Sequence, residues 1–196
     1  MSLRKFGWMF GTTLLMGGLG GLLAGILLGR QELFGGSISN FFMGSFMSIL
    51  VGLTVSVVAQ MGLFAYMTFN YMARSIFKSP TLWKSVQVFL ILFTFFDMIY
   101  LRYTAGTRGD SVFPYMIEPI LLLFIALVTA YAKVKLTNPT AWIPTVFFIF
   151  VVTTIEWIPG LTKDNFGSML MMIMPLLFCN VWQILQLHRV TVKRES

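Results

Sequence analysis

The sequence predicts an all-α integral membrane protein, a six-transmembrane-helix bundle whose N- and C-termini are cytoplasmic. Three observations lead to this fold class. Of the 196 residues, 57% are apolar and only 11% are charged, whereas an average soluble domain is about 25% charged. The mean hydropathy is +0.83. The apolar residues form long runs instead of the alternating segments of about 10 residues that build a transmembrane β-barrel. So few charges exclude a water-soluble fold.

Six apolar runs are each close to the roughly 20 helical residues that cross a bilayer. They lie at residues 6–29, 41–69, 82–103, 113–132, 141–158 and 167–187. Gly-Gly, Ser-Pro and Asn-Pro pairs precede the second, third and fifth runs, where turns are expected. The first run is longer than the 7–15 apolar residues of a cleaved signal peptide, so we expect it to be retained. Because the connections are short, we predict one transmembrane domain over residues 1–196.

The basic residues predict the orientation of the chain. Ten of the 14 lysines and arginines fall in the two termini, in the connections after the second and fourth runs, or, for Lys84, at the start of the third run. Short connections rich in Lys and Arg stay on the cytoplasmic side. We therefore predict a multi-pass membrane protein with both termini on the cytoplasmic side. The net charge of +7 reflects this topology and attraction to anionic lipid, and with no basic patch on an extended polar surface we expect no nucleic-acid partner.

The first two runs carry small residues at four-residue steps, which places them on one helix face. The members are Gly17, Gly21, Gly25 and Gly29 in the first run, and Gly44, Ser48, Gly52 and Ser56 in the second. Small residues let two helix backbones approach closely in lipid. The favoured interpretation is that these two helices pack against each other. The alternative left open is that the small-residue stripe of the first run faces a partner protein. Formation of a homo-oligomer is also left open.

Three acids stand inside apolar runs, at similar distances of about 4–9 Å from the outer helix ends at 1.5 Å per residue. They are Asp97, Glu118 and Glu156, and the bases at comparable depth are Arg102 and Arg30. Ionised side chains in a membrane normally pair or face a wet cavity. One interpretation of this polar cluster is an ion-pair network that holds the helices together. The other is an outward-facing pocket that senses a ligand, an ion or pH.

Catalysis finds little support in the sequence. None of the nucleophile, phosphate-loop or zinc-protease motifs is present, and the single histidine, His188, stands at the opposite end from the acids. Cys179 lies in the middle of the last run, where a buried structural thiol is expected. We therefore predict no enzyme, no cofactor and no metal site. A small transporter or channel that uses the same carboxylates remains the alternative, although no inverted repeat supports it.

Several short stretches, taken in order, resemble one small family. They are SVVAQMGLFAY at 56–66, LWKSVQ at 82–87, FDMIYLRY at 96–103, IEWIP at 155–159, PLLFCN at 175–180 and LHR at 187–189. This order is similar to that of the KinB-signalling-pathway activation proteins (KbaA-like) of spore-forming Bacillus-type bacteria. The resemblance implies a non-enzymatic membrane protein that acts with a membrane sensor histidine kinase and promotes sporulation through the phosphorelay. It carries over no catalytic or ligand-binding residues.

Overall fold

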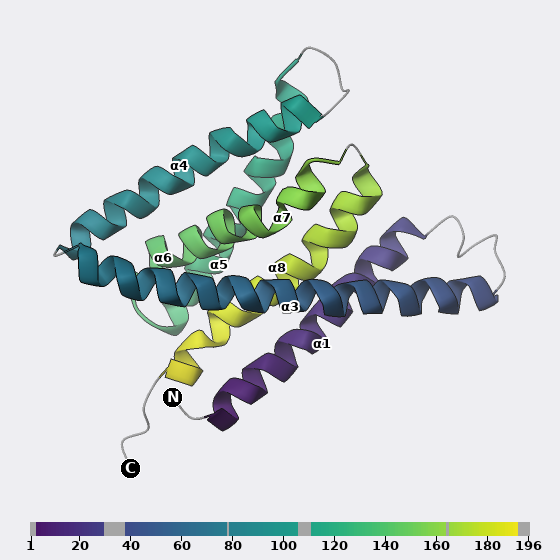
Figure 1. Ribbon diagram of the computed structural model, residues 1–196, viewed down its shortest axis with the longest axis horizontal. Helices are drawn as coiled ribbons and strands as arrows, with labels where there is room; N and C mark the ends of the chain where they lie inside the picture. Colours follow the sequence, from purple (N-terminus) through teal and green to yellow (C-terminus); the bar gives the residue numbers. More distant parts are fainter. Residues whose placement is uncertain (1–2, 30–37, 78, 106–110, 164, 192–196) are drawn as a thin grey trace. The chain divides into compact units, whose positions relative to one another are not determined.

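The computed structural model describes residues 3–29, 38–77, 79–105, 111–163 and 165–191, and all regular structure in these ranges is helical (Figure 1). This confirms the predicted helical class. Within these ranges, six helices are long and apolar enough to cross a membrane. The helices form two compact units, residues 1–60 with 165–196 and residues 61–164. We call them the first and second unit and describe each by itself.

The first unit is built from α1 (Leu3–Leu28), the residues of α3 (Ile38–Ile76) up to Gln60, and α8 (Phe166–Thr191). α1 and α8 run antiparallel and side by side (Figure 1). The Asn165 side chain begins α8, because its Oδ1 accepts hydrogen bonds from the backbone amides of Gly167 and Ser168, at 2.9 and 3.3 Å. This is the capping that a helix N-terminus requires.

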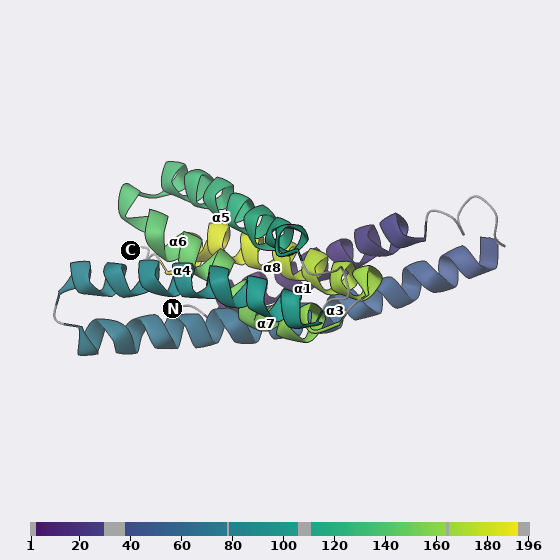
Figure 2. The same cartoon turned by 90° about the horizontal axis from the view of Figure 1, so that it is seen from above.

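The second unit contains the remainder of α3 and the helices that follow it. These are α4 (Pro80–Ala105), η1 (Phe113–Met116), α5 (Ile117–Leu136), η2 (Pro139–Ala141), α6 (Trp142–Phe147), η3 (Phe148–Val152) and α7 (Thr153–Leu161). α4 starts at a proline, which suits the first turn because its missing N–H needs no partner there. α4 then returns beside the C-terminal part of α3 (Figure 2). The indole Nε1 of Trp83 on α4 donates to Asn70 Oδ1 on α3 at 2.9 Å.

α3 is longer than the predicted run at 41–69. It continues without a break over 39 residues, about 58 Å at 1.5 Å per residue. A bilayer core is only about 30 Å thick. The chain from 38 to 76 contains no proline, so no residue removes a helical hydrogen bond and the helix ends only near Pro80.

The fifth apolar run is not one regular helix. η2, α6, η3 and α7 follow each other without a gap over Pro139–Leu161, and η3 is a π-helical segment. Phe148, Ile149 and Phe150 in this segment are all fully buried. Three consecutive buried residues cover most directions around a helix axis, so this segment lies in the interior of the second unit. A π-helical turn inside an α-helix is rare and often marks a functional position.

Candidate functional site

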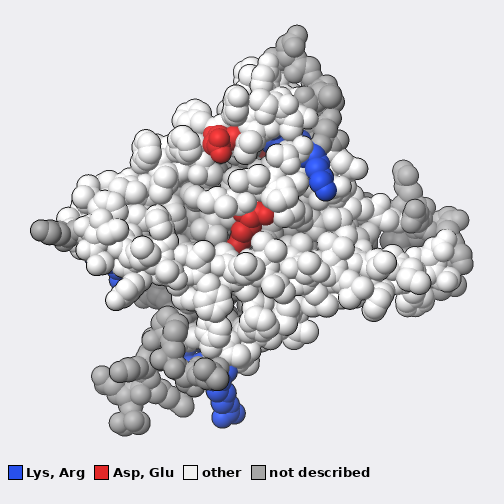
Figure 3. Space-filling view, viewed as in Figure 1, with Lys and Arg blue, Asp and Glu red and all other residues white. Residues whose placement is uncertain are grey.

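Charged side chains are sparse on the surface of the protein. On the face seen in Figure 3, most atoms belong to uncharged residues, and the acidic and basic patches are small. The described acids are those expected in the polar cluster, Asp97, Glu118 and Glu156, and all belong to the second unit. The structure pairs Glu118 with a basic side chain and places Asp97 and Glu156 on α4 and α7.

Arg102 and Glu118 form an ion pair between α4 and α5. Arg102 Nη2 lies 3.5 Å from Glu118 Oε1, with the arginine side chain fully buried and the glutamate side chain 15% exposed. Arg102 reaches this position because Thr94, Met98 and Arg102 occupy successive turns of the buried face of α4. Burying a charge costs several kcal/mol unless other groups compensate it, so the remaining contacts of this arginine matter.

The other contacts of Arg102 are with the end of α7. Its Nη1 donates to the backbone carbonyls of Leu161, at 3.0 Å, and Lys163, at 3.3 Å. Leu161 is the last residue of α7, and the last carbonyls of a helix lack partners within it and carry partial negative charge. Arg102 therefore caps α7 from a neighbouring helix. One guanidinium ties α4, α5 and α7 together at a single level.

Asp97 takes no part in this network. It lies on α4 and is half-buried, but it forms no ion pair or hydrogen bond with another residue in the described ranges. Five residues separate it from Arg102, so with 3.6 residues per turn it points away from the buried stripe. The helix phase, which the depth estimate ignored, separates this acid from the arginine.

Glu156 on α7 lies against α3. A Cβ built on Gly62 would overlap the Glu156 carboxylate and would also come within 3.2 Å of Val152 Cγ1. Only a glycine leaves room for this side chain at that point of α3. Glu156 follows the π-helical segment by a single turn, and the extra residue in that segment alters the direction in which the following side chains point.

Arg30, the fifth predicted member of the polar cluster, lies outside the described residues. The structure thus pairs Arg102 with Glu118, leaves Asp97 on another face of α4, and places Glu156 beside Gly62. Sequence reasoning missed both Gly62 and the two carbonyls at the end of α7. Gly62 carries a weak signal, a glycine inside an apolar helix, whereas backbone carbonyls carry none.

In the first unit, the small-residue stripe lies between α1 and α3. A Cβ on Gly17 would lie 2.6 Å from the Gly52 carbonyl oxygen, and one on Gly21 would lie 2.8 Å from Gly52 Cα. Gly25 in turn faces Ser48. Each contact involves atoms near the backbone, so α1 and α3 approach as closely as two helices can.

The serines of the stripe act through their small size. Ser48 Oγ donates to the Gly44 carbonyl at 2.8 Å and Ser56 Oγ donates to the Leu53 carbonyl at 2.7 Å, both within α3. Two predicted members lie outside the helix contact. A Cβ on Gly44 would meet nothing within 4 Å, and Gly29 would meet only the carbonyl of Gly25 in its own helix.

A second close approach in the first unit involves a glycine that the four-residue pattern omits. A Cβ on Gly20 would lie 2.7 Å from Pro175 Cα on α8. Gly20 and Gly21 are adjacent, so they face different neighbours, about 100° apart around α1. α1 thus presents one glycine face to α3 and another to α8. Further along α8, the Cys179 thiol donates to the Thr13 carbonyl at 3.5 Å.

The described residues contain no group of three His, Cys, Asp or Glu side chains that could hold a metal ion. His188 Nδ1 lies 2.8 Å from the Leu185 carbonyl of its own helix, an ordinary position for a polar side chain near a helix end.

Comparison with known proteins supplies the biological setting. The family described as KinB-signalling pathway activation in sporulation (KbaA) matches residues 16–190. The chain is also 34% identical, over 164 residues, to the KinB-signaling pathway activation protein of Bacillus subtilis (strain 168). That match covers 81% of this chain and 83% of the relative. No solved structure matches the chain. These findings confirm the resemblance seen in the sequence: the chain belongs to the KbaA family, whose role is KinB-signalling pathway activation in sporulation.

Proposed function

We propose that this protein is a non-enzymatic, multi-pass protein of the bacterial plasma membrane that activates a membrane sensor histidine kinase by docking on it within the bilayer. Six long apolar helices in the described ranges support the membrane location. The distribution of lysine and arginine supports cytoplasmic termini. The family match supports the pathway.

The observation that carries the docking proposal is an exposed aromatic face on α4. Phe89, Phe93, Phe96 and Tyr100 are 58–68% exposed, and their spacing of four, three and four residues places them along one side of the helix. The rings of Phe89 and Phe93 stack, with centroids 6.4 Å apart. Aromatic side chains are enriched where proteins bind each other because each contributes a large contact area at low entropic cost.

The position of Asp97 supports a link between this face and a signal. Asp97 lies one position after Phe96 and four after Phe93, so it borders the aromatic face. A carboxylate in an apolar environment is costly when ionised. Binding of a partner, a cation or a proton at Asp97 changes the free-energy cost of its carboxylate. A kinase shifts between two states only if this protein binds one state more tightly than the other.

The Arg102 network gives this face a rigid support. Because Arg102 ties α4 to α5 and to the end of α7, the C-terminal part of α4 cannot shift without breaking a buried ion pair. Removing one member of such a pair is strongly unfavourable. We therefore infer that α4 presents its aromatic face as a preformed docking surface.

The experiment is site-directed photo-crosslinking in a native spore-forming host. A photoreactive residue replaces Phe93, Phe96 or Tyr100 on α4, and control positions are Leu121 and Val128, which are exposed on α5. After purification in mild detergent, the expected result is a histidine kinase crosslinked from the α4 positions and not from the α5 positions.

Four results would contradict the docking proposal or favour another role for the protein. Recovery of lipid alone at every position indicates that the aromatic face meets the bilayer. Equal recovery of the kinase from α4 and α5 indicates non-specific proximity. A crosslink to a second copy of this chain assigns the aromatic face to a homo-oligomer. An ion flux through reconstituted protein that requires Asp97 supports the transporter alternative.

A further inference from the structure

A polar pocket lies in the second unit, where α3 ends, α4 begins and the fifth run starts. Its volume is about 400 Å³ and none of its lining residues is acidic. This is within the usual size of a small-ligand site. Two basic side chains, Arg74 from α3 and Lys84 from α4, line it. Along α4 it lies toward the opposite end from Arg102, at the end where the basic residues gather.

Gln87 makes this pocket more than a surface depression. Its side chain is fully buried and lines the pocket. Neither Nε2 nor Oε1 has a hydrogen-bond partner among the residues that the structure describes. Buried polar groups are nearly always hydrogen-bonded, and each exception calls for an explanation. A ligand that accepts a hydrogen bond from Nε2 and donates one to Oε1 explains why this amide has no protein partner.

The wall of the pocket is held in place by other side chains. Trp83 stacks on Phe77 with ring centroids 5.7 Å apart and planes 15° apart. Its Nε1 donates to Asn70 Oδ1, so the Asn70 amide N–H groups are the ones left to donate. The pocket therefore offers two cations, the amide groups of Asn70 and Gln87 as donors, and the buried Gln87 Oε1 as an acceptor, with the Thr140 hydroxyl also in its lining. This set matches a phosphate group accompanied by a hydroxyl.

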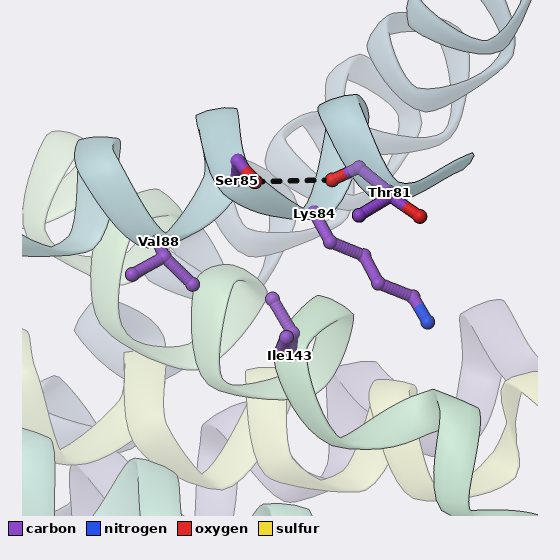
Figure 4. A pocket seen from close by; sticks show the side chains of 5 residues that line it. All are labelled: Thr81, Lys84, Ser85, Val88 and Ile143. Atoms are coloured by element: carbon purple, nitrogen blue, oxygen red, sulfur yellow. Dashed lines mark hydrogen bonds between the residues drawn. The ribbon is translucent and has the colours of Figure 1, made fainter. Parts of the chain in front are cut away.

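A second depression lies between α4 and α6 (Figure 4). Lys84 lines both the polar pocket and this depression. Val88 on α4 and Ile143 on α6 face each other across it (Figure 4). The Ser85 hydroxyl donates to the Thr81 carbonyl at 3.2 Å, so this polar group is already satisfied within α4. The volume of this second depression is about 380 Å³. A polar pocket beside an apolar depression, with a lysine between them, matches a lipid better than a free anion.

We propose that this pocket binds the phosphate and headgroup hydroxyls of an anionic phospholipid. The phosphate lies between Arg74 and Lys84, and the headgroup hydroxyl donates to Gln87 Oε1. The glycerol and the start of an acyl chain follow the apolar depression past Val88. The proposal rests on the membrane location proposed above and is independent of kinase docking.

The test is a lipid titration of the purified full-length protein in detergent, followed by native mass spectrometry. The probes are phosphatidylglycerol, phosphatidylcholine and inorganic phosphate. We expect phosphatidylglycerol to bind about tenfold or more tightly than phosphatidylcholine, because choline has no hydroxyl to donate to Gln87 and places a positive charge beside Arg74 and Lys84. Arg74→Gln and Lys84→Gln each remove most of this preference. Lys135→Gln is the matched control, because Lys135 is exposed, belongs to the same unit and lies outside the pocket.

Gln87→Met separates ligand binding from folding. Methionine keeps the length of the side chain and removes the two unsatisfied atoms, so thermal stability without lipid should stay equal or rise. Binding of phosphatidylglycerol should nevertheless fall about tenfold. A purely structural glutamine changes stability and leaves lipid binding unaltered, and that result overturns the proposal.

The remaining outcomes also decide the question. Binding of inorganic phosphate without preference between the two lipids overturns the lipid assignment in favour of a free phosphate. An equal effect of Lys135→Gln shows only general charge attraction and overturns the site. If kinase crosslinking fails while lipid binding responds to Gln87→Met, the docking proposal fails alone and this pocket stands.

Discussion

Substituting Gly21 by alanine tests the close packing of α1 on α3. The added Cβ would lie 2.8 Å from Gly52 Cα and 2.9 Å from Gly52 N, and it would overlap the Ser48 carbonyl oxygen. These are backbone atoms, so no side-chain rotation relieves the overlap. Carbon atoms pack best at about 3.5–4.0 Å, so the two helices must separate by roughly 1 Å. The matched control is Gly44→Ala, on the same stripe, where a Cβ meets nothing within 4 Å.

The expected difference between these two variants follows from the structure. Both gain the helix propensity of alanine over glycine, about 1 kcal/mol, and this term cancels in the comparison. What remains is the cost of overpacking, about 1–3 kcal/mol. A change of 1 kcal/mol shifts the melting temperature of a chain of this size by about 2–4 °C. Gly21→Ala should therefore melt about 2–12 °C below Gly44→Ala.

The assay is thermal unfolding of each purified variant in the same detergent, followed by helical circular dichroism. Irreversible unfolding is handled by comparing variants at one scan rate, because the ranking then still reports relative stability. If Gly21→Ala melts at or above the temperature of Gly44→Ala, the α1–α3 contact does not hold the first unit together, and the small-residue stripe serves another purpose.

Three further substitutions test the second unit. Arg102→Gln should lower stability by about 3–5 kcal/mol, because it removes the cation of a largely buried ion pair together with the cap on the end of α7; replacing both Arg102 and Glu118 by methionine should recover part of the loss in thermal unfolding. Gly62→Ala should cost about 1–3 kcal/mol through overlap with the Glu156 carboxylate, and a double-mutant cycle should show a smaller penalty in a Glu156→Ala background. Asp97→Asn should leave abundance unchanged, because Asp97 has no hydrogen bond or ion pair within the described ranges, while sporulation frequency in a host lacking its own copy should fall. An unchanged frequency removes Asp97 from the signalling proposal.

The helices themselves were predictable from the sequence because each apolar run is close to or above the roughly 20 residues of a membrane span. α4 illustrates this, since its predicted range of 82–103 lies inside the observed Pro80–Ala105. Observed helices generally extend past the predicted runs, because helical hydrogen bonding continues through polar residues until a proline or glycine stops it. The π-helical segment Phe148–Val152 could not be predicted, because its apolar residues suit an α-helix equally well.

The sequence indicated which residues could belong to the candidate site but not which of them contact each other. Depth along the helices placed three acids and two arginines at a similar level without choosing a pair, and the structure pairs Arg102 with Glu118. Depth does not specify the direction of a side chain, which depends on the rotation of each helix about its axis. Asp97 was expected at that level but lies on another face of α4. The orphan amide of Gln87 was also beyond sequence reasoning, because whether a buried group finds a partner is a property of the packed structure.

The two ends of α4 differ in a way that bears on regulation. Near one end, Arg102 already has a carboxylate and two carbonyls as partners, so a change there mainly removes favourable contacts. Gln87 lies 15 residues earlier, about 22 Å along the axis, and its buried amide has no partner within the described ranges. A ligand at Gln87 binds more tightly because it forms the hydrogen bonds that this amide lacks. Ligand binding then stabilises the conformation of the protein in which the pocket is formed. Mutational sensitivity should therefore concentrate around Arg102, and response to small molecules or lipids around Gln87. Because α4 also carries the aromatic face between these two positions, a ligand that biases the Gln87 end acts on the helix that we propose contacts the kinase.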